Sequence, residues 1–451
     1  GGGGGGPRRR RGGGGSLAGG QPRGRRGMKA LVFGTDPEPW EPPPGAPAAL
    51  DAFKASPMAL LEVPDARPLL DDWVVLRPRL TGICGSDSKQ ALLDFNESEI
   101  DNAMGGLASF PQVMGHEVVA DVVELGPRAR GVEVGQRVVL NPWLSCLPRG
   151  VSPLCPSCQA GDYSLCHSFE AGPISKGLHS GVSSDATGGF AEVMPAHTSM
   201  VLPVPDGVSD EQAVLADPFS VSLHSVVRHP PPEGGKVIVY GAGALGTCAV
   251  AALRALHPGT EVAVVARFPA QADLARSLGA TVVVGSDDPR AVIEQLARWS
   301  GGHIIEPLAG LPMCHPGGVD VVYDTVGKPE TAEVSVRLLR QRGTLVKSGF
   351  HGSARWEWSP LYFKEISWVG SNAFGLEEVE GRRRHALAHY LEMAQSGRID
   401  VTPMLTHTFT LDRWRDAFTC IACQGDTGAI KVAFDFRGAA APDPAAGSLT
   451  G

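Results

Sequence analysis

The sequence predicts an α/β protein whose second half forms a doubly wound parallel sheet and whose first half forms a smaller, partly closed β domain. From Lys236 onward, short apolar runs alternate with helical runs, the order that builds a parallel sheet covered by helices on both faces. Between Met28 and about Val208, short β-like runs follow one another closely and are broken by glycine and proline. These two observations define the predicted fold class.

The expected elements of the first half begin with a strand directly after Met28. The other expected strands have apolar residues between turn residues: Trp73–Arg77, Glu117–Leu125, Gln136–Asn141, Gly189–Met194 and Ser199–Pro203. A helical pattern follows from Ser209 to Val227, and Pro218 within it predicts a break.

The second half opens with a strand at Lys236–Tyr240, a helix to Leu256 and a strand at Glu261–Arg267. Later strands are expected at Thr281–Val284, Val319–Tyr323, Thr344–Gly349 and Trp368–Ser371, with helices at Asp287–Trp299 and Pro329–Leu339. The last part predicts helices at Arg382–Ser396 and Trp414–Cys423, an apolar stretch around Phe409 and a strand at Ala429–Phe436. We therefore expect domains at 28–215 and 216–371, with 372–437 returning to the first domain and disordered tails at 1–27 and 438–451.

Composition and charge bound the classes of function. A chain of 451 residues with 43% hydrophobic and 20% charged residues can bury a large core, as soluble globular proteins do. The net charge is −8, but residues 1–27 hold seven arginines and no acidic residue, which leaves −15 on the remaining chain. An acidic body argues against a nucleic-acid-binding surface.

The glycine- and arginine-rich segment 1–27 is interpreted as an extension upstream of a start at Met28, with an RNA-binding tail as the alternative. It contains no apolar run of signal-peptide length. The nine cysteines, an odd number, favour thiols that bind metal over disulfides. These features predict a cytoplasmic protein.

A glycine motif follows the strand at Lys236–Tyr240. Gly241, Gly243 and Gly246 form Gly-x-Gly-x-x-Gly between a strand and a helix, the context in which this motif binds a dinucleotide. We expect these glycines, with Ala244 and Leu245 between them, to bind the cofactor. The alternatives are an ordinary glycine-rich turn or a membrane span over 237–256, and the glycines together with Arg254 argue against the span.

Four cysteines lie within a segment rich in proline and glycine: Cys146, Cys155, Cys158 and Cys166. Four thiolates in a loop predict a closed, tetrahedral zinc site of the structural kind. A more scattered group comprises Cys84, His116 and Asp217. One sulfur, one nitrogen and one oxygen ligand would leave a coordination position open, as catalytic zinc requires, although isolated residues of these types more often pack in a core.

These motifs, in this order, resemble the zinc-dependent medium-chain dehydrogenases/reductases, the superfamily of zinc alcohol, polyol and threonine dehydrogenases. The resemblance covers Met28 to about Phe436 and rests on Gly82–Asp87, Gly115–Glu117, the four-cysteine segment, Gly189–Glu192, Ala216–Pro218, the Gly241/Gly243/Gly246 motif and Asp324–Gly327. It implies a GroES-like β-barrel-type catalytic domain joined to a Rossmann cofactor-binding domain.

The resemblance also implies roles for single residues. Cys84 and His116 correspond to ligands of a catalytic zinc, and Asp217 to the third ligand. Glu117 corresponds to an alternate or outer ligand, and Ser86 to the hydroxyl that passes on the substrate proton. Asp87 would orient the histidine ligand, and Cys146, Cys155, Cys158 and Cys166 would hold a structural zinc.

The chain departs from the family pattern at four places. In the four-cysteine segment, or lobe, Ser152 stands where the first cysteine would fall, so that Cys146 must reach in across the eight residues that separate it from Cys155. Lys89 replaces a relay histidine, and Gly302–Pro316 is longer than usual. Ala266 and Arg267 end the second strand without the usual acid, and the Arg267 cation favours NADP slightly over NAD.

The expected activity is hydride transfer between an alcohol or polyol, or the matching carbonyl, and NADP or NAD, with one catalytic and one structural zinc. The resemblance implies a homo-oligomer, dimer or tetramer, and no nucleic-acid or membrane partner is expected. The alternatives are a zinc-free quinone or enone reductase of the same superfamily and a dinucleotide-binding protein without turnover. The loops Phe95–Phe110 and Gly302–Pro316 are expected to shape the substrate pocket.

Overall fold

The structure is a computed structural model that describes residues 27–44, 46–93, 103–349 and 356–438. The two predicted tails, 1–27 and 438–451, lie outside the described residues except for one residue each, and so does the first half of the Phe95–Phe110 loop. Among the described residues, no helix combines the length and the apolar character that crossing a membrane requires.

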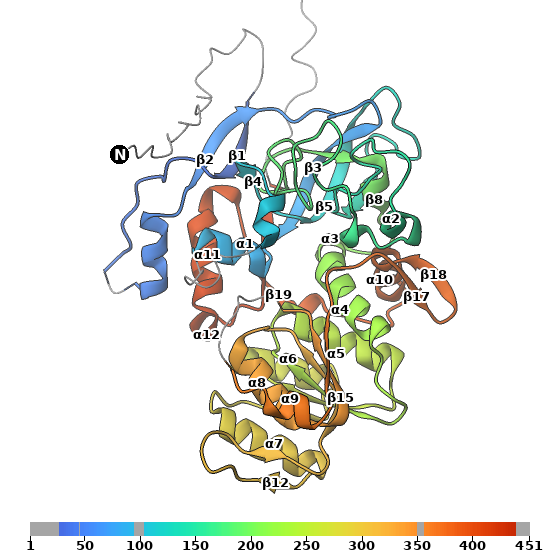
Figure 1. Cartoon of the computed structure of the whole chain (residues 1–451). Coiled ribbons are helices and arrows are strands. Elements are labelled where there is room, and N and C mark those ends of the chain that lie inside the picture. The colour runs from blue at the N-terminus through green and yellow to red at the C-terminus, as the bar shows by residue number, and fades with distance from the viewer. Residues whose placement is uncertain (1–26, 45, 94–102, 350–355, 439–451) are drawn as a thin grey trace, which may run out of the picture.

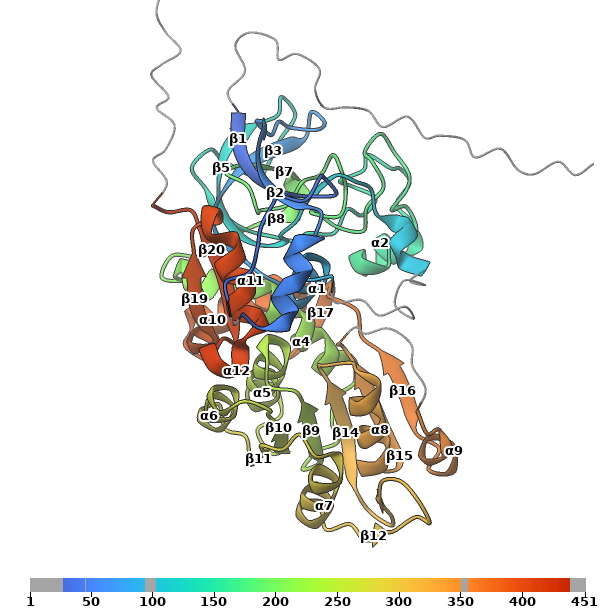
Figure 2. The same ribbon diagram turned by 90° about the vertical axis from the view of Figure 1, so that its left-hand side faces the viewer.

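A six-stranded parallel sheet confirms the predicted doubly wound α/β fold (Figure 2). Its strands follow one another in the spatial order β11-β10-β9-β14-β15-β16. Their bounds are β9 Lys236–Tyr240, β10 Glu261–Val265, β11 Val282–Val284, β14 Val319–Asp324, β15 Leu339–Lys347 and β16 Ser367–Gly370. The order reverses between β9 and β14, which is where such sheets bind their ligands, at the carboxyl ends of the strands.

Helices cover both faces of this sheet, because alternate residues of its strands are apolar on both sides. In β9, Val237 and Val239 point into one buried cluster and Ile238 into another. The helices are α5 Ala244–Leu256, α6 Pro269–Ser277, α7 Pro289–Ser300, α8 Pro329–Leu338 and α9 Ser359–Phe363. Proline occupies the first position of α6, α7 and α8, where its missing amide hydrogen costs no hydrogen bond.

The β-rich part lies above the parallel sheet in Figure 1 and contains two sheets. A three-stranded sheet joins β1 Gly27–Phe33, β2 Met58–Pro64 and β4 Gln112–Val113. A seven-stranded sheet joins β3 Trp73–Gly82, β5 Glu117–Leu125, β6 Arg137–Leu140, β7 Met194–His197, β8 Val201–Pro203, β19 Leu405–Phe409 and β20 Lys431–Asp435. Because β20 pairs with β3, the last strand of the chain lies in the sheet of the first part.

The predicted strand at Gly189–Met194 is wrong for most of its length, since β7 begins only at Met194. Gly189 and Phe190 instead donate backbone hydrogen bonds to Gly115 and Met114 outside any named strand.

Between the two parts lie α3 Asp210–Ala213 and α4 Ala216–Arg228, then the hairpin β17 Leu376–Val379 and β18 Arg382–His385, and α10 Ala386–Gln395. The predicted break at Pro218 is wrong: Pro218 lies in the first turn of α4, where no helical acceptor awaits its amide, and the chain breaks at 214–215 instead. The helix predicted at Arg382–Ser396 begins only at Ala386, because Arg382–His385 pairs antiparallel with β17.

The insertion Gly302–Pro316, expected to shape the substrate pocket, lies away from the carboxyl ends of the parallel strands. It forms a small hairpin of β12 Ile304–Ile305 and β13 Met313–Cys314 between α7 and β14. Both views place β12 at the end of the molecule farthest from the β-rich part (Figures 1 and 2). The hairpin therefore lies at the amino ends of the parallel strands, opposite the edge at which such sheets bind ligands.

Candidate functional site

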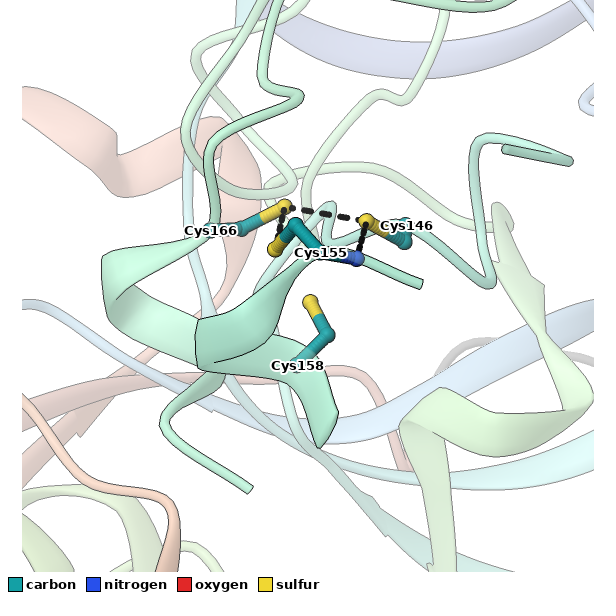
Figure 3. A group of neighbouring side chains, drawn as sticks. All are labelled: Cys146, Cys155, Cys158 and Cys166. Atoms are coloured by element: carbon teal, nitrogen blue, oxygen red, sulfur yellow. Dashed lines mark hydrogen bonds between the residues drawn. The ribbon is translucent and has the colours of Figure 1, made fainter. Parts of the chain in front are cut away.

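The four lobe cysteines converge although they come from different local structures (Figure 3). Cys155 is the residue before α2 Pro156–Ala160, and Cys158 lies within that helix. Cys166 ends a short helical turn, while Cys146 reaches in from the loop after β6. The ligand atoms of all four lie within 4.8 Å of one another.

The distances and hydrogen bonds of this cluster fit a tetrahedral zinc ion. Zn–S bonds of about 2.3 Å place the sulfurs of a tetrahedron about 3.8 Å apart. Here the Sγ atoms of Cys146 and Cys166 lie 3.6 Å apart, and those of Cys155 and Cys166 lie 3.9 Å apart. No disulfide joins them.

Backbone amides support the thiolate form of the cluster. The amide of Cys155 donates to Cys146 Sγ at 3.4 Å, and that of His167 donates to Cys155 Sγ at 3.5 Å. Burial raises the pKa of Cys155, but hydrogen bonds from the amides of His167 and Cys158 outweigh it and bring that pKa to about 6. Burial raises the pKa of Cys158 and brings that of Cys166 to about 11, so the thiols differ in how readily they lose a proton, and a bound divalent cation would favour the thiolate form of all four.

Two antiparallel strands bring the second candidate metal group together. Gly82, near the end of β3, pairs with Glu117, the first residue of β5. Cys84 therefore lies two residues beyond one strand, and His116 lies directly before the other. Cys84 also precedes helix α1 Gly85–Ala91, and its backbone amide donates a hydrogen bond of 2.9 Å to the Asp87 carboxylate, which caps the helix.

The ligand atoms of Cys84, His116 and Glu117 lie within 4.8 Å of one another. Burial lowers the pKa of His116, but the negative charges of Asp87 and Cys84 raise it well above its ordinary value. His116 Nδ1 lies 3.8 Å from Asp87 Oδ1, an ionic contact longer than a hydrogen bond. A site that draws a proton onto a buried imidazole favours positive charge, so its residues fit a divalent metal.

Asp217, the third ligand implied by the resemblance, lies in the first turn of α4 and is 7% exposed. Its carboxylate does not belong to the group of mutually close ligand atoms in the described part of the chain. It nevertheless faces that group: burial raises the pKa of Asp217 to about 7, and the charge of His116 opposes the rise. Its role as a ligand stays a prediction.

The residues predicted for the proton path lie on α1. Ser86 is exposed in the first turn, and Lys89 follows three residues later and is half-buried. Residues three apart lie on the same side of a helix, so the two side chains share one face of α1.

Each glycine of the cofactor motif is needed for a different steric reason. Gly241 has a φ of 97°, in the left-handed region that favours glycine. A Cβ at Gly246 would overlap the carbonyl oxygen of Gly241, whereas a Cβ at Gly243 would meet no atom within 4 Å. Gly243 thus leaves the approach to the start of α5 open, as a bound pyrophosphate requires.

The start of α5 suits an anion. Gly243 is the residue before the helix and provides no side-chain cap, so its first amides are available to a ligand. Ala244 and Leu245 form the first turn of α5, and the Ser222 hydroxyl of α4 donates to the carbonyl of Leu245 at 2.8 Å. The helix that carries Asp217 is therefore fixed to the helix that would hold the cofactor.

Arg267 follows β10, and Ala266 before it is buried. The Arg267 side chain is 66% exposed, lies 3.3 Å from Asp287 Oδ1 and covers the ring of Phe268. Arg267 is thus an exposed cation just beyond β10, where the ribose of a dinucleotide would lie.

Two further residues lie near the metal group, and the sequence indicated only His179, as a histidine that could line the cleft. The ring of His179 lies 4.7 Å from that of His116, and its Nδ1 faces the carbonyl of Ser180 at 2.7 Å. Lys431 of β20 is 3% exposed and contacts Glu117. An isolated histidine in a loop and an isolated lysine in a strand look like packing and surface residues, so only the fold brings them to the site.

Comparisons with known proteins agree with this geometry. The model of the alcohol dehydrogenase GroES-like domain matches residues 70–206, and that of the zinc-binding dehydrogenase matches residues 244–388. The first covers most of the β-rich part with both candidate metal groups, and the second begins at the first residue of α5.

Relatives are similar over most of their length. The chain is 29% identical to D-arabinitol dehydrogenase 1 of Uromyces fabae, and 26% identical to sorbitol dehydrogenase of Bacillus subtilis (strain 168), each time over 79% of this chain and 88% of the relative. The crystal structure of 2R,3R-butanediol dehydrogenase from Bacillus subtilis has the same fold, with a TM-score of 0.63 at 22% identity over 90% of this chain and 99% of that one. The chain belongs to the zinc-type medium-chain dehydrogenases/reductases.

Proposed function

We propose that this chain is a zinc-dependent enzyme that transfers a hydride between a polyol or other secondary alcohol, or the matching carbonyl, and NADP. Its family and relatives make it an NAD(P)-dependent alcohol or polyol oxidoreductase. The observation that carries the zinc-dependent form is the buried group of Cys84, His116 and Glu117, which lies beside Asp217 on the helix fixed to the cofactor helix.

The protein residues would divide the work as follows. Cys84, His116 and Glu117 would hold the catalytic zinc, and the Asp217 carboxylate would be a fourth, exchangeable ligand. When bound, zinc supplies a Lewis acid that lowers the pKa of an alcohol, and the nicotinamide supplies the redox step. The Ser86 hydroxyl is placed to carry away the proton that leaves the substrate, because it follows Cys84 by two residues.

The lobe would hold the second zinc. Cys146, Cys155, Cys158 and Cys166 provide four sulfur ligands and leave no open position, which is the arrangement of a structural site. The lobe would therefore stabilise the fold without taking part in the reaction.

An activity screen with matched variants tests the proposed function. The zinc-loaded protein is assayed with a panel of polyols, secondary alcohols and the matching ketones, with NAD and NADP in parallel. Turnover is expected in the wild type and at least about a hundredfold less in Cys84→Ser, whereas Cys423→Ser, a control at the end of α11 Trp414–Ala422, keeps wild-type activity. Equal activity in Cys84→Ser, or reduction of quinones that survives removal of zinc, would favour the zinc-free reductase instead.

The preference for NADP rests on Arg267. Its guanidinium is exposed just beyond β10. Position 266 holds alanine and not an acidic residue that could bind a ribose hydroxyl. Arg267→Ala is expected to lower kcat/KM with NADP by about tenfold or more and to leave the value with NAD nearly unchanged. An unchanged ratio of the two cofactors would remove the argument for NADP.

We further propose that two copies pair through the edge of β16 that pairs with no other strand among the described residues. This strand is the last of the parallel sheet, and beside it Trp358, Tyr362 and Phe363 are 56%, 77% and 76% exposed. A two-fold axis would pair the edge with itself and cover these rings, and the oppositely charged Arg342 and Glu365 flank it. Sedimentation should show a dimer in the wild type and a monomer in Tyr362→Glu/Phe363→Glu; a monomeric wild type would refute the pairing.

A reducing compartment such as the cytoplasm is proposed for the same chain. All nine cysteines are free in the structure, and five of them, Cys84, Cys146, Cys155, Cys158 and Cys166, have proposed metal roles that require reduced thiols. A fluorescent fusion found in an oxidising compartment would contradict this proposal.

A further inference from the structure

A buried lysine connects the two chain segments that carry the candidate ligands of the catalytic metal. Lys431 is the first residue of β20 and is 3% exposed. Its Nζ donates to the carbonyl of Ile83 at 3.0 Å and forms an ion pair with Glu117 Oε2. Ile83 directly precedes Cys84, and Glu117 directly follows His116, so one ammonium group touches the neighbours of both ligands.

The backbone at Gly82 lies so close to this ion pair that it leaves no room for a side chain at position 82. A Cβ at Gly82 would overlap Glu117 Oε2 and would lie 3.0 Å from Lys431 Cε. Gly82 is in ordinary strand conformation, paired with Glu117, so the reason for glycine here is space. The position of the Glu117 carboxylate is therefore set by Lys431 on one side and by the bare backbone of Gly82 on the other.

Stability alone gives a weak reason for such a pair. Removing two charges from water costs several kcal/mol per ion, and apolar residues of similar volume often replace a buried ion pair without loss of stability. The pair lies instead beside the candidate metal group: burial lowers the pKa of Lys431, but the negative charges of Glu117, Cys84 and Asp217 raise it above its usual value. The ammonium is thus part of the charge balance around the metal group.

We propose that Lys431 is a positioning residue that holds one oxygen of Glu117 and so limits how much negative charge Glu117 gives to the metal. This inference rests on the proposed function, since it assumes a metal held by Cys84, His116 and Glu117. Glu117 would contact the metal with its other oxygen, while Lys431 neutralises part of its charge. The metal would bind less tightly and act as a stronger Lewis acid than with an unpaired carboxylate.

The test measures zinc affinity by competition with a chromophoric chelator, which does not depend on activity. Lys431→Gln keeps hydrogen-bond donors toward Ile83 and Glu117 but removes the charge, and Lys431→Arg is the control that keeps it. Lys431→Gln is expected to bind the site zinc roughly tenfold or more tightly, and Lys431→Arg within about threefold of the wild type. The lobe zinc serves as an internal reference that should not change.

The pH profile of turnover gives a second readout. The proposal predicts that the rising limb of kcat moves to higher pH in Lys431→Gln and stays in place in Lys431→Arg. A folded Lys431→Gln that binds the site zinc with wild-type or weaker affinity would overturn the proposal. A wild type that binds zinc only in the lobe would instead refute the proposed function, so the two failures are distinguishable.

A second variant covers the case in which Lys431→Gln does not fold. Lys431→Gln/Glu117→Gln removes both charges together, and it is compared with Glu117→Gln alone. Because Lys431 acts through Glu117, the two should bind the site zinc within about threefold of each other. A larger difference would show that Lys431 acts as an independent charge and would overturn the proposal.

Discussion

Arg149 provides the sharpest test of how the thiol lobe is built. Its side chain is 0% exposed and donates five hydrogen bonds to backbone carbonyls and none to a carboxylate. The acceptors, with distances of 2.9–3.0 Å, are Leu144, Ala171, Ile174, Ser175 and Gly177. The guanidinium thus ties together the loop segments on both sides of the four cysteines.

The perturbation is Arg149→Lys, which keeps the charge but has only three donors on one nitrogen. At least two of the five carbonyls lose their partner. A buried polar group without a partner costs about 1–3 kcal/mol, so the expected loss of stability is about 2–6 kcal/mol. Gly172 has no room for a side chain beside the Arg149 carbonyl, which limits how far the loop can shift to repair the loss.

The assay follows release of the lobe zinc to a chromophoric chelator as urea is raised. Arg149→Lys should release this zinc at clearly lower urea than the wild type. Arg128→Lys is the matched control, because the Arg128 side chain is 71% exposed and forms an ion pair with the exposed Asp71. Its change should therefore stay within about 0.5 kcal/mol. Identical release curves for Arg149→Lys and the wild type would refute the reasoning.

Two further predictions concern the cofactor half. Gly246→Ala places a Cβ against the Gly241 carbonyl and should weaken cofactor binding by at least about tenfold in a titration of cofactor fluorescence, whereas an unchanged Kd would show that the turn adapts. Burial raises the pKa of Asp324 from 3.8 to about 6. The Asp324 carboxylate therefore binds a proton more readily in the folded protein than in the unfolded chain. Its contribution to stability is lost as pH rises from about 4 to 6. The side chain of Asp324→Asn does not titrate, so the free energy of unfolding of this variant, measured in urea, should rise by up to about 3 kcal/mol relative to that of the wild type over this pH range. A difference that stays constant between about pH 4 and 7 would contradict the raised pKa.

The sequence predicts the parallel sheet because each of its strands is an apolar run bounded by turn residues. The same logic fails for Arg382–His385, a run of charged residues that forms a strand against β17, where Arg383 lies opposite Glu378 and Arg384 opposite Glu377. It also fails for Pro218, whose effect depends on its position within the helix and not on its presence.

The sequence predicts the four-cysteine group better than the group of Cys84 and His116, and the reason is physical. The lobe cysteines lie close in sequence, so their spacing alone brings them near one another. Cys84 and His116 meet only because β3 and β5 pair in one register, and Lys431 reaches them only because β20 adds to the same sheet from the far end of the chain. Register and strand addition of this kind leave no local pattern, so Lys431 could not be predicted, and the closeness of Glu117 to Cys84 followed only from the family resemblance.

The most direct test of the central claim is the zinc content of the purified protein, measured per chain. Two separate buried groups predict two zinc ions in the wild type, one in Cys84→Ser with the lobe intact, and one in Cys158→Ser with the catalytic site still loaded. A wild type that holds a single zinc, or a Cys84→Ser variant that keeps both, would contradict the assignment of the catalytic metal to Cys84, His116 and Glu117.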